Sequence, residues 1–234
     1  MFELIKQNGK ARRGRFTTAH GVTETPFFMP IATKGAVKTL SSSDMEKLGA
    51  SILLSNTYHL LLRPGFEGIK KLGGLHKLMN WNKPILTDSG GYQVFSLSGA
   101  KMSAGAARLP VGQGSASGGN KTTEEGVKFQ SHIDGAKIFL TPELSMEMQK
   151  AIGSDIAMQF DDVASGVSTR ERYEEAMERS LRWGARSKDA FMSLRGGQQT
   201  DEAISPHEKI ASSSMTTPRN DNGKLFGIVQ GGTH

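Results

Sequence analysis

Short apolar segments that alternate with helical patterns constrain the fold of this chain more than any other feature. Turn residues bound each segment, so we interpret the segments as buried strands. They cover residues 27–31, 51–55, 84–87, 156–160 and 225–229. Strands that alternate with helices form βαβ units with right-handed crossovers, and such units build a parallel sheet. The pattern therefore predicts an α/β fold, either a doubly wound sheet or a barrel.

The helical patterns between these segments have recognisable ends. Ser43 and Glu46 have the spacing of a capping box, which predicts a short helix that ends at Gly49. Thr141 precedes a proline, as an N-cap often does, and Gly153 is placed to end that second helix.

A longer helix is predicted over residues 169–191, opened by Ser168 with Glu171 three positions on. Its expected apolar stripe consists of Tyr173, Ala176, Met177 and Leu181. Its outer face is expected to carry the i,i+4 ion pairs Glu175–Arg179 and Glu178–Arg182.

Three stretches depart from the alternation. Residues 1–25 carry a basic Arg-Arg-Gly-Arg run and a glycine turn, and we expect a small N-terminal antiparallel sheet there. Residues 99–121 and 193–223 are rich in small and polar residues, and we expect loops or insertions. The whole chain, 1–234, is predicted to form one barrel-type domain with these additions.

Composition narrows the class of protein. The formal net charge is +6 and the pI is near 9.5, which favours polyanionic partners such as nucleic acid without proving them. Cysteine is absent, so these residues offer no disulfide and no thiolate metal site. The sequence shows no apolar run of membrane-spanning length and no signal peptide, and we therefore expect a cytoplasmic protein with no membrane association.

A carboxylate and two glycines follow the third strand directly. The run is Asp88, Ser89, Gly90, Gly91 and Tyr92. Glycines let a flat ring approach the backbone, an aromatic side chain offers a stacking face, and a carboxylate transfers protons. The alternative is a glycine-rich turn in which the carboxylate only caps the next helix.

Two further strands end in polar residues, Asp161 after the fourth strand and Gln230 with Gly231 after the fifth. The carboxyl ends of barrel strands converge on one active site, so we favour a TIM-type barrel with one pocket over three unrelated caps. A carboxylate and an amide match the edge of a guanine-like base.

Six blocks of sequence, in this order, closely resemble the tRNA-guanine transglycosylases. They are FMPIAT at 28–33, LSNTYHL at 54–60, RPG at 63–65, DSGGYQ at 88–93, FQSHIDG at 129–135 and FGIVQGG at 226–232. Together with the stretches between them they cover nearly the whole chain outside the two insertions.

The resemblance implies a (β/α)8 barrel that exchanges guanine at the wobble position of tRNA for a 7-deazaguanine through a covalent ribosyl-enzyme intermediate. It implies that Asp88 is the general acid/base and that Asp161 and Gln230 bind the base edge. By the same resemblance Tyr92 stacks on the base, Ser89, Gly90, Gly91 and Gly231 line the pocket, and Asn56 lies near the ribose. The implied partners are tRNA, the base and a second copy in a homodimer.

The sequence also departs from the family pattern. The family's nucleophilic aspartate and its structural Cys3His zinc site have no counterpart here, and only about five barrel strands are present. We therefore expect an incomplete barrel that is inactive and poorly stable alone, with no cofactor or metal in this chain, whether it is a truncated gene, a split enzyme or a partial sequence.

Val163 is a finer departure. Bacterial members of the family commonly carry Phe-Asp-Glu-Cys where this chain has FDDV at 160–163, and eukaryotic members carry Asp-Asp-Val. The less polar wall at Val163 favours queuine over its 7-aminomethyl precursor as the incoming base.

Two other function classes remain open on the sequence. One is a noncatalytic accessory chain that binds tRNA or the base. The other is a nucleoside or glycoside hydrolase that uses paired carboxylates and needs no RNA.

Overall fold

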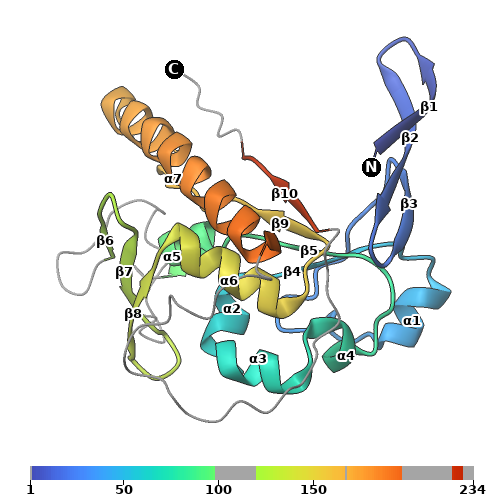
Figure 1. Cartoon of the computed structure of the whole chain (residues 1–234), viewed down its shortest axis with the longest axis horizontal. Coiled ribbons are helices and arrows are strands. Elements are labelled where there is room, and N and C mark those ends of the chain that lie inside the picture. Colours follow the sequence, from blue (N-terminus) through green and yellow to red (C-terminus); the bar gives the residue numbers. More distant parts are fainter. Residues whose placement is uncertain (1, 98–119, 167, 197–222, 229–234) are drawn as a thin grey trace, which may run out of the picture.

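The computed structural model describes residues 2–97, 120–166, 168–196 and 223–228, and it has a mixed α/β fold with three sheets (Figure 1). The described strands are β1 (Phe2–Asn8), β2 (Ala11–Thr18), β3 (Gly21–Thr25), β4 (Leu53–Ser55), β5 (Ile85–Thr87), β6 (Lys121–Thr122), β7 (Val127–Gln130), β8 (Lys137–Leu140), β9 (Ile156–Met158) and β10 (Lys224–Phe226). The described helices are α1 (Ser42–Lys47), α2 (Thr57–Leu62), α3 (Phe66–Leu72), α4 (Leu75–Met79), α5 (Gly91–Leu97), α6 (Pro142–Ile152) and α7 (Arg170–Gly196). In the part of the chain covered by these ranges, no helix combines the length and apolar composition that crossing a membrane requires.

The central sheet is parallel, with strand order β10-β9-β5-β4. Four of the five predicted strands are therefore confirmed, although each is shorter than predicted. The first predicted strand, 27–31, is wrong as a continuous strand, because only a parallel bridge between Ile31 and Leu54 marks its place beside β4. Pro26 and Pro30 lack a backbone N–H, so this segment cannot form an uninterrupted hydrogen-bond ladder.

The caps of α1 and α6 set the ends of these helices. The predicted capping box of Ser43 and Glu46 is wrong by two positions, because Ser41 is the N-cap and Asp44 is its N3 partner. At α6 the prediction is confirmed: the Thr141 side chain accepts from the backbone N–H of Leu144, and Gly153 ends the helix with φ of 82°.

The predicted apolar stripe of α7 is confirmed only in part. Ala176 is buried as predicted, but Met177 and Leu181 are 53% and 69% exposed, and the other buried positions of the helix are Ser180, Trp183 and Ser187. The reason is local hydrogen bonding, because Ser180 and Ser187 accept from backbone N–H groups of the segment after β9. Small side chains on this face let the helix approach that segment closely. The helix also continues to Gly196, so it includes the first residues of the predicted insertion at 193–223, whose remainder up to 222 lies outside the described residues.

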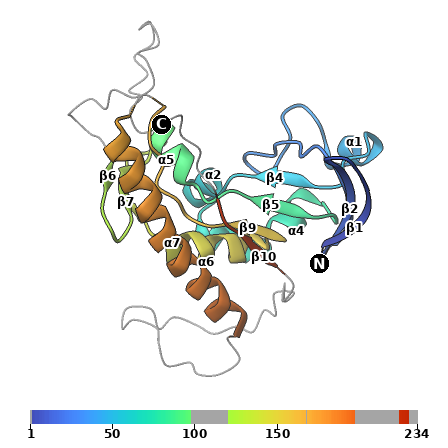
Figure 2. The same cartoon turned by 90° about the horizontal axis from the view of Figure 1, so that it is seen from above.

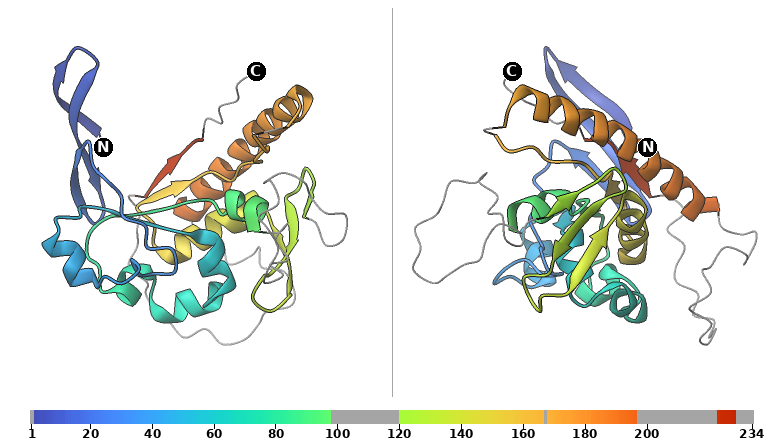
Figure 3. Two further views of the ribbon diagram at one scale, coloured as in Figure 1. Left: turned by 180° about the vertical axis from the view of Figure 1, so that it is seen from behind. Right: turned by 90° about the vertical axis from the view of Figure 1, so that its left-hand side faces the viewer.

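The two smaller sheets are antiparallel and lie at opposite ends of the molecule (Figures 1 and 3). The N-terminal sheet β1-β2-β3 confirms the expectation for residues 1–25. The sheet β6-β7-β8 was not predicted from the sequence, and its strands are only two to four residues long. The predicted insertion at 99–121 lies outside the described residues except for its last position, Lys121, where β6 begins.

The buried apolar side chains of the described residues form three clusters, the smallest of which contains Phe16, Ile52, Leu86 and Ile156. One buried cluster joins α3, α4 and α6 to β4 and β5 and contains Trp81, and a second joins α2 and α7 to β7 and β8 through Tyr58 and Trp183. Figure 2 shows α6 and α7 side by side along the sheet, as their extensive contact requires. These helices hold β5 and β9 in place, and the candidate site lies at the ends of those two strands.

Candidate functional site at the strand ends

The carboxyl ends of β5 and β9 place two carboxylates next to each other. The strands are neighbours in the parallel sheet, with Thr87 opposite Ala157. Asp88 follows β5 directly, and Asp161 follows β9 after two residues. Parallel strands end on the same side of a sheet, so residues 73 positions apart in the sequence meet there.

Asp88 is held by donors from the start of α2 and from its own turn. The backbone N–H of Thr57 donates to Oδ1 at 2.9 Å, the N–H of Gly90 donates to the same oxygen at 3.2 Å, and the side-chain amide of Asn56 donates to Oδ2. Asn56 is also the N-cap of α2, where its Oδ1 accepts from the N–H of His59. One side chain therefore starts the helix after β4 and orients the carboxyl group after β5.

The ionisation of Asp88 is shifted strongly. The pKa of this carboxyl is raised from 3.8 to about 7. Burial is the largest cause and the nearby charge of Asp161 adds to it, whereas hydrogen bonds from the backbone N–H groups of Thr57 and Gly90 act in the opposite direction. A carboxyl group with this pKa exists in both protonation states near neutral pH, as an acid/base catalyst requires.

Ser89 and Gly91 connect the two strand ends. The Ser89 hydroxyl donates to Oδ1 of Asp161 at 3.1 Å and accepts from the N–H of Gly91 at 3.3 Å. A Cβ on Gly91 would lie 2.8 Å from the carbonyl oxygen of Asp161 and 2.9 Å from its Oδ1. The glycine is therefore needed for the close approach of the backbone to Asp161. Gly90 has φ of 86°, a conformation that favours glycine.

The adjacent acidic residues after β9 have separate roles. Asp162 faces α7, where it forms a two-bond pair with Arg172 at 2.6 and 2.9 Å and a bond with Arg179 at 2.5 Å. Its backbone N–H donates to Ser180. The charge of Asp162 is therefore balanced by two arginines of α7. The side chain of Asp161, in contrast, is hydrogen-bonded to Ser89.

The remaining predicted site residues do not belong to this hydrogen-bonded group. Tyr92 lies on the first turn of α5 and is 59% exposed, so one face of its ring is accessible. Val163 is partly buried in the segment between β9 and α7. Gln230 and Gly231 lie outside the described residues. The structure thus brings together Asn56, Asp88, Ser89, Gly90, Gly91 and Asp161.

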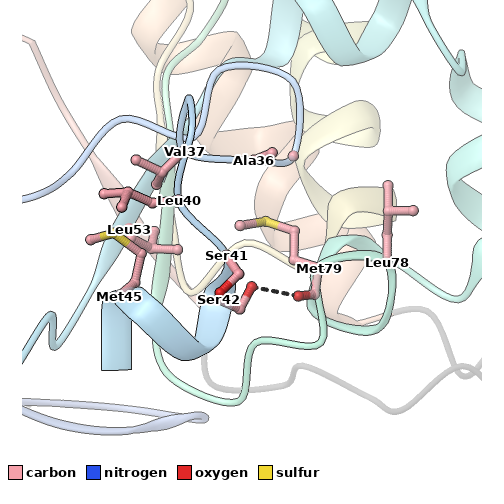
Figure 4. Close-up of a pocket in the computed structure, with 10 residues that line it drawn as sticks. Ala36, Val37, Leu40, Ser41, Ser42, Met45, Leu53, Leu78 and Met79 are labelled. Atoms are coloured by element: carbon pink, nitrogen blue, oxygen red, sulfur yellow. Dashed lines mark hydrogen bonds between the residues drawn. The ribbon is translucent and has the colours of Figure 1, made fainter. Parts of the chain in front are cut away.

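A cavity of about 190 Å³ lies elsewhere, between the loop before α1 and helix α4 (Figure 4). Its lining is mostly apolar, and its hydroxyls belong to Ser41 and Ser42, of which Ser42 donates to the carbonyl of Met79. No titratable side chain lines it. We therefore place the candidate site at the strand ends, where the perturbed carboxyl group is, and not in this cavity.

A second polar cluster lies at the opposite, amino end of β9 and was not predicted from the sequence. Asp155 has a fully buried side chain that contacts Nδ1 of His20 at 2.9 Å and Nε2 of His76 at 3.3 Å. Among the described residues these three could hold a metal ion. However, the two imidazole rings stack at 3.6 Å, and Nε2 of His76 also lies 3.1 Å from the carbonyl of Lys83.

That carbonyl requires Nε2 of His76 to carry a proton, and a protonated ring nitrogen cannot ligate a metal. The cluster is therefore better described as a hydrogen-bonded anchor between the N-terminal sheet, α4 and β9. The sequence signal that could have found it is the run Ser-Asp-Ile at the start of an apolar strand, since a charged residue there must be paired.

Comparisons with known proteins agree in pointing to one family. The family model described as Queuine tRNA-ribosyltransferase matches residues 7–234. A protein of that name from Clostridium botulinum (strain Hall) is 46% identical over 235 aligned positions, which cover 100% of this chain and 53% of the relative. One from Dechloromonas aromatica (strain RCB) is 46% identical over 233 positions, which cover 100% of this chain and 51% of the relative. The chain thus spans about half the length of the curated relatives it matches.

Proposed function

Because the chain belongs to the queuine tRNA-ribosyltransferase family, we propose that it takes part in exchanging guanine in tRNA for a 7-deazaguanine base. The single observation that carries the proposal is the Asp88 carboxyl, which has a pKa of about 7 and lies at a strand end beside Asp161. The proposed substrates are tRNA and the free base, and the reaction is a pentosyl transfer.

The base edge is assigned to Asp161, with Ser89 as its fixed neighbour. A carboxylate accepts hydrogen bonds from the ring N–H and exocyclic amino group of a guanine-like base. Gly90 and Gly91 are proposed to line the pocket, where the absence of side chains lets their backbone pack closely against Tyr58 and Asp161. Tyr92, which is 59% exposed, is proposed to stack on the base. Gln230 and Gly231 are proposed to complete the recognition of the base.

Asp88 is proposed to transfer the proton as the base leaves and its replacement enters. The departing guanine needs a proton, and the incoming base must lose one, so a single group with a pKa near neutrality serves both steps. Asn56 holds one carboxyl oxygen of Asp88, which fixes the direction in which the proton is delivered. Because the enzyme acts on a base within a loop, the nucleotide must first be extruded into the pocket.

The architecture proposed for the complete enzyme is a (β/α)8 barrel, in which the parallel strands described here are one part. The sequence has no cysteine, so its residues do not fit the family's Cys3His zinc site, and no step is assigned to a metal. We also propose that the intact enzyme is a cytoplasmic homodimer.

Val163 is proposed to favour queuine over the 7-aminomethyl precursor. It occupies the position after the acidic pair, in the segment that follows the base-binding Asp161. A branched apolar side chain there offers no hydrogen bond to an aminomethyl group, whereas it tolerates a larger ring substituent. Equal turnover with both bases would contradict this preference.

The test of the proposed function is exchange of labelled guanine into tRNA, with free guanosine as the alternative substrate. Label that enters tRNA but not guanosine, and that is lost in Asp88→Ala, supports the proposal. Release of ribose from guanosine would indicate a hydrolase instead. Binding of guanine without any exchange by the complete protein would indicate an accessory chain.

A further inference from the structure

The side-chain amide of Gln149 on α6 makes four hydrogen bonds close to the strand ends that form the candidate site. It is 1% exposed, and its Oε1 accepts from the hydroxyl of Thr87 at 2.8 Å and from the N–H of Met158 at 2.9 Å. Its Nε2 donates to the carbonyl of Met158 at 2.9 Å and to Oγ of Ser145 at 3.1 Å. A primary amide has two acceptor and two donor positions, so none is left unused.

The hydrogen bonds between Gln149 and Met158 lie where the ladder between β5 and β9 ends. The ladder between β5 and β9 ends with Thr87 opposite Ala157, and Met158 is the next residue of β9. On its other side β9 remains paired, since the N–H of Gln159 donates to Phe226 on β10. The amide of Gln149 therefore replaces β5 as the backbone partner of Met158, at the point where the two strands separate to form the site.

The same helix also fixes the turn after β5. Ser145, one helical turn before Gln149, donates its hydroxyl to the carbonyl of Ser89 at 2.8 Å and is fully buried. A continuous path of hydrogen bonds thus runs from Met158 through Gln149 and Ser145 to Ser89. One end of the path is Ser89 itself, and the other, Met158, lies three residues before Asp161, the partner of Ser89.

We propose that Gln149 is a positioning residue for the base pocket, which sets the separation of the two strand ends and hence the geometry of Ser89 and Asp161. The inference rests on the proposed function, because it assigns Asp161 to the base edge. It goes further in placing a determinant of base affinity on a helix that does not touch the base. Hydrogen bonds to a charged group are strong enough that misaligning the Asp161 carboxylate should weaken base binding roughly 10- to 100-fold.

The direct test is guanine binding by the purified chain, measured by equilibrium dialysis with labelled guanine. Gln149→Met keeps the size of the side chain and removes all four bonds, and we expect roughly 10- to 100-fold weaker binding. The control is Thr23→Val, which removes from a 1% exposed residue of β3 the hydroxyl that donates to the carbonyl of Ser51, away from the candidate site. If the two variants lose equal thermal stability and equal affinity, Gln149 is merely structural and the proposal fails.

A second variant keeps the test decisive if Gln149→Met does not fold. Gln149→Glu in its protonated form can accept from Thr87 and Met158 and still donate to the Met158 carbonyl, whereas its ionised form loses every donor. We expect its affinity for guanine, relative to the unmodified chain at the same pH, to be nearly normal at low pH and to fall as pH rises. A constant ratio across pH would overturn the proposal.

A failure of the proposed function can be distinguished from a failure of the positioning role of Gln149. If neither the unmodified chain nor Asp161→Asn binds guanine, the base assignment fails, and a crystal structure of the Gln149 variant still decides the positioning role. In that structure we expect Ser89 Oγ to have lost its contact with Asp161 Oδ1. A contact retained at 3.1 Å would refute the role of Gln149.

Discussion

The hydroxyl of Ser89 donates a 3.1 Å hydrogen bond to Oδ1 of Asp161, across the gap between two neighbouring strand ends. These residues are 72 positions apart in the sequence, and the bond is internal to the proposed base pocket. It orients the Asp161 carboxylate before any base arrives, so less free energy is lost to ordering on binding.

Replacing Asp88 should remove exchange activity while leaving the fold intact. Proton transfer by a positioned side chain contributes about 10²- to 10⁴-fold, so Asp88→Asn in the complete enzyme should lower kcat by a factor in that range. Guanine binding should weaken far less, because Asp161 and Ser89 remain. The measurement is labelled-guanine exchange alongside dialysis, and a variant with more than half the normal kcat would rule out the acid/base role.

The raised pKa of Asp88 should also appear in stability. Because the folded pKa is about 7 and the unfolded value is 3.8, folding favours the protonated form, and stability attributable to this group is lost as pH rises through this interval. Asp88→Asn should therefore stabilise the chain by on the order of a few kcal/mol at pH 8, and by much less at pH 4. Urea unfolding at both pH values measures the gain in the free energy of unfolding. A larger gain at pH 4 than at pH 8 would contradict a raised pKa of Asp88.

Adding a methyl group at Gly91 should disturb the pocket. In Gly91→Ala the new Cβ would lie 2.8 Å from the Asp161 carbonyl, so the backbone must move and the Ser89–Asp161 bond should be strained. We expect at least about tenfold weaker guanine binding. Gly166→Ala is the control, since no atom lies within 4 Å of the Cβ that it would add. Equal affinities of the two variants would contradict the close approach.

The ion pairs of Asp162 should be important for stability. Its side chain is 4% exposed and Arg179 is 12% exposed, so Asp162→Ala leaves a poorly solvated guanidinium with only Glu175 and Glu124 as acidic partners. Removing one member of such a pair typically costs about 3–5 kcal/mol, and partial exposure of Arg172 reduces this to roughly 2–4 kcal/mol. Urea unfolding measures the loss. The exposed pair Arg170–Glu174 is the comparison, and Glu174→Ala should leave the midpoint unchanged.

The anchor at Asp155 predicts a different dependence on pH. Burial raises the pKa of this carboxyl, but hydrogen bonds from His76, the N–H of Ile85 and His20 outweigh it, and the net pKa is lowered from 3.8. A lowered pKa gives stability that is present above 3.8 and lost as pH falls through the folded value. Asp155→Asn should thus be clearly less stable than the unmodified chain at pH 7. The difference in thermal midpoint should shrink below about pH 4, and a difference that grows there would contradict the assignment.

Apolar segments with clear boundaries predicted most of the parallel sheet. The strands at 84–87 and 156–160 were found because buried strands in such sheets are continuously apolar, and the proximity of Asp88 to Asp161 follows from strand direction. The helix α6 was also predictable, since its cap residues act within one turn of sequence.

Features that depend on tertiary contacts could not be predicted in this way. The buried face of α7 contains Ser180 and Ser187, whose burial is explained by backbone N–H groups on another segment, and a search for apolar periodicity selects Met177 and Leu181 instead. Gln149 likewise looks like an ordinary polar helix residue until Met158 is placed beside it. The sheet β6-β7-β8 was not predicted because its strands are only two to four residues long, and the alternation in β7 covers just four residues.

The three-residue strand β9 is fastened at both margins, by Asp155 to two histidines and by Met158 to the amide of Gln149. The length of β9 therefore determines where Asp161 lies relative to Ser89. Substitutions between these margins change only packing, but an inserted or deleted residue would reverse the facing of every later side chain. We therefore expect β9 to tolerate substitutions at Ile156 and Ala157 but not insertions or deletions.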